Sequence, residues 1–300
     1  MSKIIFVVSS NPIALAAALA GKASATVEAE YGEVCVPGTV LTMAHHGERA
    51  GQPAPCSYEN GCLAGEVVEV VGLSHFDLDT LGGCAAIIGR KPSADGFWRL
   101  AEFIDLNGAH KLARGINETD ASPEDVRVLH AFWAWSKSFR VFAPRDGSVA
   151  DVTKQVLEGI HVLESILVDQ DEVLLAAGDA FRAAEGELNR KSFLEADDGV
   201  VVRVGDQFTN HLYADPDGEA YKAVVSYNTA TGAVTVSFAE TPQGMSANSI
   251  VQKVFTDRDD EGKLLAGGHA GIAGSPRNRR ASLDEFARAV QVTRETIAGR

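Results

Sequence analysis

The segment 74–83, Ser-His-Phe-Asp-Leu-Asp-Thr-Leu-Gly-Gly, places one imidazole and two carboxylates close together. An apolar, β-branched run over 66–73 precedes it and predicts a buried strand, and a small, aliphatic run typical of a helix start follows. We therefore expect His75, Asp77 and Asp79 at the carboxyl end of a strand, where open α/β sheets bind their ligands. These donors suit a divalent cation, and the imidazole favours Mn²⁺, Fe²⁺ or Zn²⁺ over Mg²⁺. The alternative is a loop in which Asp77 only caps the helix.

Two adjacent histidines, His45 and His46, follow a second β-like run over 34–43. Adjacent side chains of a strand point to opposite faces, so both rings reach one site only if the chain turns there. Gly47 permits such a turn. We therefore predict that both histidines join the metal site.

A third element, 96–104, has the pattern of an amphipathic helix or a short buried element, and it leads into Asp105. Because Asp105 directly follows an apolar run, as the first aspartate pair does, it is a further candidate ligand, and His110 is another. The alternative is an Asx-turn in which Asn107 and Gly108 make the bend.

A glycine-rich segment, 267–274, reads Gly-Gly-His-Ala-Gly-Ile-Ala-Gly and is soon followed by Arg277. Such a composition lets the backbone approach a ligand closely and offer its N–H groups to an anion. His269 and Arg277 can add charge-assisted hydrogen bonds to a phosphate. We therefore expect Gly267, Gly268, His269 and Arg277 to bind substrate, the alternative being a flexible surface loop.

The formal net charge of the chain is −14. This charge opposes binding to long duplex nucleic acid, which depends on many Lys and Arg contacts to phosphates. A short or small phosphorylated substrate fits better, because Arg277, Arg279 and Arg280 form a local basic cluster in an acidic chain.

No apolar run approaches the ~20 residues that span a bilayer, so no membrane partner is expected. The start of the chain, 1–10, is typical of a first strand rather than of a signal peptide. The four cysteines form no Cys-x-x-Cys pair. We therefore expect reduced thiols and a cytoplasmic protein.

The alternation of β-like and short helical stretches in the first part of the chain predicts an α/β fold with a mostly parallel sheet. Helical patterns follow, with Trp133 and Trp135 expected in the core, and short β runs then predict a smaller C-terminal α+β domain. The expected layout is a metal-binding α/β domain over 1–145, a helical connector over 146–192 and a substrate-binding domain over 193–300. The individual elements expected are a helix starting at Ser122-Pro123, helices over 151–169 and 171–190, strands over 200–204, 223–227 and 233–238 with a hairpin loop at 229–232, and a last helix over 283–297 capped by Ser282.

These segments resemble the motifs of the DHH phosphoesterase superfamily. Ser74-His-Phe-Asp-Leu-Asp79 looks like the family's first motif, and Gly267-Gly-His269 with Ala273-Gly274 looks like that of its C-terminal domain. Ala44-His-His-Gly47 is similar to the Asp-His-His motif. Ala44 stands where the family has its aspartate, and the histidine pair precedes the Asp-x-Asp segment instead of following it. The C-terminal match, over 220–276, is the more specific half.

The resemblance implies two Mn²⁺ ions, with Mg²⁺, Fe²⁺ or Zn²⁺ as alternatives, bridged by Asp77 or Asp79. It implies a metal-dependent phosphohydrolase that acts on a small nucleotide, a short oligonucleotide or another phosphorylated metabolite, and a homodimer is compatible with it. Asp77, Asp79 and His46 are then the catalytic residues. The metal ligands implied are His45, His46, His75, Asp77, Asp79 and Asp105.

Two other classes of function fit the same residues. A phosphate- or nucleotide-binding protein with impaired catalysis is one, and the missing aspartate at Ala44 motivates it. A metal-dependent hydrolase of amides or esters is the other. Metal content separates the enzyme from the binding protein, and activity on a phosphodiester separates the two hydrolases.

Overall fold

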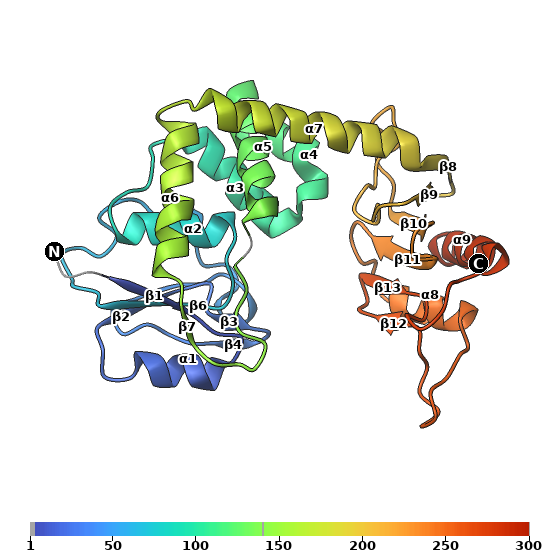
Figure 1. Cartoon of the computed structure of the whole chain (residues 1–300), viewed down its shortest axis with the longest axis horizontal. Coiled ribbons are helices and arrows are strands. Elements are labelled where there is room, and N and C mark those ends of the chain that lie inside the picture. The colour runs from blue at the N-terminus through green and yellow to red at the C-terminus, as the bar shows by residue number, and fades with distance from the viewer. Residues whose placement is uncertain (1–3, 140, 300) are drawn as a thin grey trace. The chain divides into compact units, whose positions relative to one another are not determined.

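The computed structural model describes residues 4–139 and 141–299, and these form a mixed α/β protein, as the sequence predicts (Figure 1). The chain divides into two compact units, Met1–Arg182 and Ala183–Arg300. The division falls inside helix α7 (Glu172–Ser192), within the segment expected to be a helical connector.

The first unit is built on a five-stranded sheet with the strand order β5-β2-β6-β1-β7 in the described residues. The first four strands in this order are mutually parallel, and only the edge strand β7 runs antiparallel. The strands are β1 (Ile5–Val8), β2 (Ser24–Val27), β5 (Leu41–Met43), β6 (Val70–Leu73) and β7 (Ala150–Asp151), and a separate pair is formed by β3 (Glu30–Tyr31) and β4 (Val34–Cys35).

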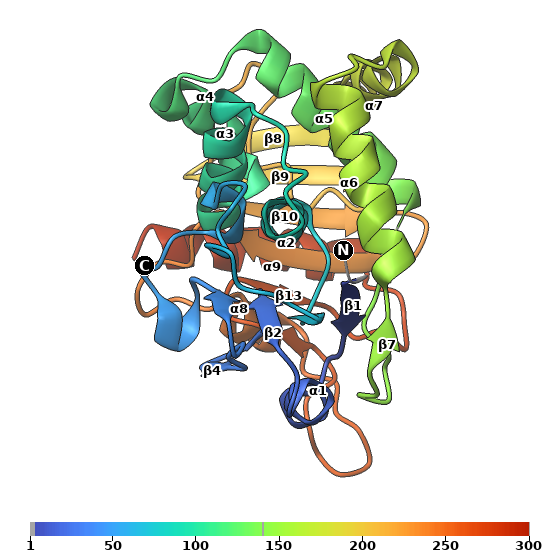
Figure 2. The same cartoon turned by 90° about the vertical axis from the view of Figure 1, so that its left-hand side faces the viewer.

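Helices cover both faces of this sheet. Figures 1 and 2 show α1 on one side of the strands and α2 and α6 on the other. The larger core lies on the α2 and α6 side, and a smaller one that includes Leu15 and Val70 lies under α1. The helices are α1 (Pro12–Leu19), α2 (Leu78–Ile87), α3 (Asp95–Asn107), α4 (Leu112–Thr119), α5 (Pro123–Ser138) and α6 (Thr153–Leu167), with 3-10 turns η1 (Gly47–Arg49), η2 (Pro55–Ser57) and η3 (Ala109–Lys111).

Helix ends follow the capping signals of the sequence. Ser122 and Asp125 form a reciprocal capping box at the start of α5, with Pro123 in the first turn. Asp77 caps α2, because its Oδ1 accepts the N–H of Thr80 at 2.9 Å. The capping role weighed for Asp77 is therefore real, and it leaves the second carboxylate oxygen for other contacts.

The helices expected over 151–169 and 171–190 are found as α6 and α7 with their ends shifted by one or two residues, and three other predicted elements differ more. The run 66–73 is a strand only over Val70–Leu73. The run 34–43 breaks into β4 and β5, and Gly38 between them packs so closely that a Cβ there would lie 2.3 Å from the carbonyl oxygen of Leu41. Helix α3 continues through Asp105 and ends at Gly108, whose φ is 90°. Asp105 is therefore presented by a helix and not by an Asx-turn.

The second unit contains a six-stranded sheet with the order β12-β13-β11-β10-β9-β8. Its pairs are antiparallel except β9 with β10. Helices α8 (Ala247–Val254) and α9 (Leu283–Ile297) pack on it and enclose an apolar core. The strands are β8 (Phe193–Asp197), β9 (Val200–Gly205), β10 (Ala223–Asn228), β11 (Ala233–Phe238), β12 (Gly267–Gly268) and β13 (Ile272–Gly274).

The sequence predicted much of this unit. The hairpin loop at 229–232 is confirmed, since Asn228 pairs with Ala233. Ser282 caps α9 with a capping box, and α9 has the predicted bounds. Among the described residues, no helix is both long and apolar enough to cross a membrane.

Helix α2 depends on glycine for its packing. A Cβ on Gly82 would lie 2.7 Å from the Cβ and 2.9 Å from the Cα of Cys56, so α2 and η2 approach more closely than an alanine at this position would allow. The backbone N–H of Cys56 donates to Asp79 Oδ1 at 2.8 Å. The glycine therefore lets η2 reach a carboxylate of α2.

We expect Gly82→Ala to lower the free energy of unfolding by about 1–3 kcal/mol, because the helix and the turn must separate. In an unobstructed helix, glycine to alanine is stabilising by about 1 kcal/mol. Gly186→Ala on α7 is the control, since the nearest atom to its Cβ would be 3.8 Å away. Urea denaturation measures both variants, and effects of equal sign would contradict this packing.

Candidate metal centre

The site lies where three neighbouring parallel strands end. Strands β5, β2 and β6 are adjacent in the sheet, and their carboxyl ends lie at the same edge. The chain leaves β2 at Glu28, β5 at Ala44 and β6 at Ser74. Each exit therefore delivers its acidic and imidazole side chains to one place, as open parallel sheets do.

Glu28, which the sequence analysis missed, lies at the middle of this site. Its side chain is only 2% exposed. Its φ of 49° is left-handed, a conformation that is uncommon for a glutamate and costs energy. The backbone is held there because its N–H donates to Met43 O at 2.9 Å and its carbonyl accepts from the Ser74 hydroxyl. The signal in the sequence was a weak one, an acid that directly follows the short strand Ser24–Val27.

His45 is surrounded by carboxylates. Its Nε2 lies 3.0 Å from Asp105 Oδ2, 3.2 Å from Glu28 Oε1 and 3.6 Å from Asp79 Oδ2. The His45 ring is almost fully buried, as are Glu28 and Asp79. This is the most enclosed part of the site, and it draws on two strand ends and two helices.

His46 and His75 form the exposed rim. Both side chains are about half exposed, His46 at 48% and His75 at 47%. His46 Nε2 lies 3.7 Å from Asp105 Oδ2, and His75 Nε2 lies 3.1 Å from Asp77 Oδ2 and 3.7 Å from Glu28 Oε2. Glu28 therefore links the enclosed and the exposed parts of the site.

The turn expected after β5 brings both histidine rings to this site. Gly47 has a φ of +48°, and the rings of His45 and His46 lie 4.0 Å apart between centroids. Glu30 fixes the segment, since one of its oxygens accepts the N–H of His46 at 2.8 Å and the other that of His45 at 3.4 Å.

Several buried polar atoms of the site have no hydrogen-bond partner within the described residues. These atoms are Glu28 Oε1, Asp79 Oδ2, Asp105 Oδ2 and both ring nitrogens of His45. The three carboxylate oxygens face the same nitrogen, His45 Nε2, and a single imidazole cannot compensate three buried carboxylates, which are costly unless further positive charge satisfies them. The donor set therefore fits a divalent cation.

Two overlapping groups have the spacing of metal ligands in the described residues. One is Glu28, His45 and His46, and the other is His45, Asp79 and Asp105; within each group the ligand atoms lie no more than 4.8 Å apart. Oxygen and imidazole donors together are typical of sites for Mn²⁺, Fe²⁺ or Zn²⁺. His45 belongs to both groups.

The acidic surroundings change the proton affinity of the site. Burial alone lowers the pKa of His45, but Asp105 and Glu28 outweigh it and raise that pKa to about 10. Burial also lowers the pKa of His75, which Asp77 raises to about 9. Burial, together with Glu28 and Asp105, raises the pKa of Asp79 far above its usual range. The protein therefore attracts positive charge strongly at this place.

The glycine-rich segment of the second unit is a β-hairpin and not an open loop. Gly268 pairs with Ala273, and a Cβ on it would lie 2.4 Å from Ile272 O. Its N–H donates to Asn248 Oδ1 at 3.1 Å, and the N–H of His269 donates to Ile272 O at 2.7 Å. Glycine is thus needed for close contact between strands, and these two N–H groups are already used.

A cavity of about 830 Å³ lies beside this hairpin and is lined by Gly267, Gly268, His269 and Arg277 among others. His269 and Arg277 are both exposed. Of the three clustered arginines, Arg279 pairs with Asp257 and Glu285, and Arg280 donates to carbonyls of the 229–230 turn. Arg277 is therefore the arginine best placed to bind an anion.

The structure brings together the predicted metal ligands of the first unit. His45, Asp79 and Asp105 lie within one group, His46 joins through Glu28, and His75 and Asp77 form the adjoining pair. His110 lies on η3 and belongs to neither metal-ligand group among the described residues. Trp133 and Trp135, both expected in the core, are only partly buried and pack against it, and Trp133 also lines a pocket next to Asp77 and Asp79.

No family model and no curated protein matches this sequence. A crystal structure of an uncharacterized protein from Helicobacter pylori G27 aligns with 79% of this chain and 78% of its own at 11% identity. The TM-score is 0.21, too low to carry an argument about fold or function.

We expect Mn²⁺ to raise the melting temperature of the protein on the order of 5 °C when it is present at 100 times its dissociation constant. Asp79→Asn should abolish this rise, because it removes a buried carboxylate whose Oδ2, unlike the Oδ1 that accepts from Cys56, has no hydrogen-bond partner. Glu158→Gln, which removes the same charge from an exposed position on α6, is the control. A rise that survives Asp79→Asn would contradict the site.

We also expect affinity for Mn²⁺ to increase from pH 6 to pH 8.5. Without metal, His45 and His75 keep their protons above neutral pH, because their pKa values are raised to about 10 and 9. A bound cation needs neutral imidazoles, so binding must release protons, and a higher pH favours release. Calorimetry in two buffers of different ionisation enthalpy measures the number of protons released on binding. A value of zero would contradict the assignment.

Proposed function

We propose that this chain is a metal-dependent phosphohydrolase of the DHH phosphoesterase superfamily, acting on a small nucleotide, a short oligonucleotide or another phosphorylated metabolite. The observation that carries the proposal is the convergence of four acidic and three imidazole side chains at one sheet edge. Three buried carboxylate oxygens that share one imidazole nitrogen make this edge suited to cations. The residues are Glu28, His45, His46, His75, Asp77, Asp79 and Asp105.

Glu28, His45, Asp79 and Asp105 would hold the enclosed cation, and the overlap of the two ligand groups supports a second ion near His46. Mn²⁺ is the proposed metal, with Mg²⁺, Fe²⁺ or Zn²⁺ as alternatives. Bound there, a divalent cation supplies Lewis-acid polarisation of a phosphoryl oxygen and lowers the pKa of a bound water.

The chain's own residues complete the chemistry. We assign His46 a catalytic role because its half-exposed ring lies at the rim, with Nε2 3.7 Å from Asp105 Oδ2, where a substrate can reach it. Asp77 divides its oxygens between the cap of α2 and His75 Nε2, so it fixes the orientation of that ring. Ser74 Oγ lies 2.8 Å from His75 Nδ1 and holds the other side of the imidazole.

In the second unit, His269 and Arg277 would bind a phosphate of the substrate that does not react. Both side chains are exposed and line the same cavity. A guanidinium and an imidazole are strong charge-assisted donors to phosphate oxygens. This function rests on side chains, because the N–H groups of Gly268 and His269 have other partners.

The layout proposed for this enzyme is a metal-binding domain over 1–145, a connector over 146–192 and a substrate-binding domain over 193–300. We also propose that it is cytoplasmic, in keeping with free thiols at Cys35, Cys56, Cys62 and Cys84.

The second candidate is a phosphate-binding protein without activity. Ala44, buried at the end of β5, offers no carboxylate where the resemblance implies one. Glu28, at the end of the neighbouring strand, supplies a buried carboxylate 3.2 Å from His45. An acid at this position favours the enzyme over the binding protein.

Hydrolysis of a chromogenic phosphodiester, bis(p-nitrophenyl) phosphate, with Mn²⁺ and with chelator tests the proposed function. We expect metal-dependent turnover in the wild type and at least about a 100-fold loss in kcat for Glu28→Gln, which removes a charge from the ligand set. Glu158→Gln should keep wild-type turnover. Mn²⁺ binding without turnover on any phosphate ester would support the binding protein instead, and turnover confined to carboxylic esters would support the other hydrolase.

With a short oligonucleotide substrate, which carries a second phosphate, we expect His269→Ala to lower kcat/KM by about 10- to 150-fold, the equivalent of a charge-assisted hydrogen bond worth roughly 1.5–3 kcal/mol. Most of the loss should be in KM, with metal content unchanged. His161→Ala, at an exposed histidine on α6, is the control. Steady-state kinetics and metal analysis measure both, and wild-type kinetics for His269→Ala would show that the hairpin does not bind substrate.

A further inference from the structure

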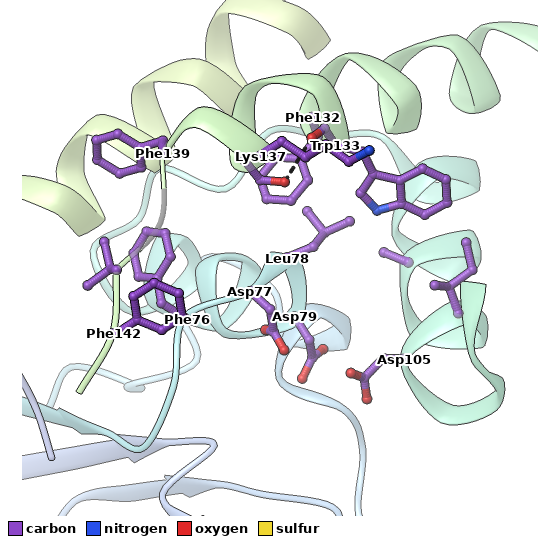
Figure 3. Close-up of a pocket in the computed structure, with 14 residues that line it drawn as sticks. Phe76, Asp77, Leu78, Asp79, Asp105, Phe132, Trp133, Lys137, Phe139 and Phe142 are labelled. Atoms are coloured by element: carbon purple, nitrogen blue, oxygen red, sulfur yellow. Dashed lines mark hydrogen bonds between the residues drawn. The ribbon is translucent and has the colours of Figure 1, made fainter. Parts of the chain in front are cut away.

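A pocket of about 460 Å³ opens directly beside the metal centre, within the first unit. Asp77, Asp79 and Asp105 line one end of it, as Figure 3 shows. We propose that this pocket receives a planar aromatic group attached to the reacting phosphate of the substrate, as in a nucleotide or an aryl phosphate ester. The inference rests on the proposed function and names its substrate class.

The walls away from the carboxylates are aromatic. Figure 3 shows Phe132 and Trp133 on the side opposite the three aspartates, and Phe76, Phe139 and Phe142 along another side. Flat, polarisable walls favour planar rings, which stack on them or meet them edge to face. Ser136 and Lys137 are the polar side chains among the remaining lining residues.

The pocket wall and the metal centre share their supporting elements. Phe76 immediately precedes Asp77 in the exit from β6, and Asp105 follows Ile104 on α3, which also lines the pocket. A group in the pocket would therefore be near enough to be bonded directly to a phosphate held at the carboxylates. This continuity identifies the occupant as part of the substrate and not as a separate ligand.

Two observations show that the aromatic wall is built but incompletely covered. Phe139 is held by stacking on Trp135, with ring centroids 4.6 Å apart. Phe142 remains 75% exposed, although large apolar side chains usually gain from burial. An aromatic ligand would cover it. The volume is also within the range of pockets that bind small organic molecules.

The test compares phosphonates, which the enzyme cannot hydrolyse at the P–C bond, by calorimetry on the Mn²⁺-loaded full chain. The probes are methylphosphonate, phenylphosphonate and an adenosine 5′-phosphonate. We expect the wild type to bind the phenyl or the adenosine probe at least about 10-fold more tightly than the methyl probe, the usual contribution of one stacked ring.

Trp133→Ala and Phe142→Ala should each remove most of this preference and leave methylphosphonate affinity within about two-fold. Val173→Ala, at an exposed apolar residue of α7, should leave all three affinities unchanged. Because Phe142 is exposed, its variant should fold even if Trp133→Ala does not. A preference shared by both aromatic probes points to a nucleobase, and one limited to the phenyl probe points to an aryl ester.

Equal affinities for the methyl and phenyl probes, with the adenosine probe no tighter, would overturn the aromatic pocket and leave the proposed function intact. Preferences unchanged in Trp133→Ala and Phe142→Ala would overturn it as well. Failure of every phosphonate to bind in the presence of Mn²⁺ would overturn the pocket and the proposed function together.

Discussion

The site depends on one constraint, the parallel alignment of β5, β2 and β6 with β2 in the middle. Since β2 is central, Glu28 at its end reaches His45 and His46 on one side and His75 on the other. Burial of these groups makes the site attract cations, because carboxylates removed from water need a compensating positive charge. The same carboxylates raise the pKa values of His45 and His75, because a protonated imidazole supplies positive charge.

The rest of the first unit holds this arrangement in place. The glycine at 82 allows η2 to contact α2, so that the N–H of Cys56 satisfies one oxygen of Asp79 and the other remains directed at His45. Glu30 fixes the His45-His46 segment through two backbone N–H groups. Hydrogen bonds of this kind orient the metal ligands, and losing them weakens metal binding or activity.

The sequence was sufficient to identify site residues that are marked by their immediate neighbours in the chain. Asp77 and Asp79 follow an apolar run, and the histidine pair precedes a glycine, so local pattern is enough. Glu28 was missed because its strand is short and its importance comes from strand order, a non-local property. The glycines at 267–268 were correctly noticed, but their cause is strand pairing with β13, which local pattern does not reveal. Trp133 was assigned to the core because helical periodicity does not distinguish a core from a pocket wall.

The central claim is that Glu28, His45, Asp79 and Asp105 hold a divalent cation. Anomalous X-ray scattering from crystals grown with Mn²⁺, recorded on both sides of the manganese absorption edge, tests it without reference to any reaction. The account predicts an anomalous peak within about 2.0–2.6 Å of oxygen or nitrogen atoms of these residues. Well-ordered crystals with no peak at this edge of the sheet, or with manganese only elsewhere, would contradict it.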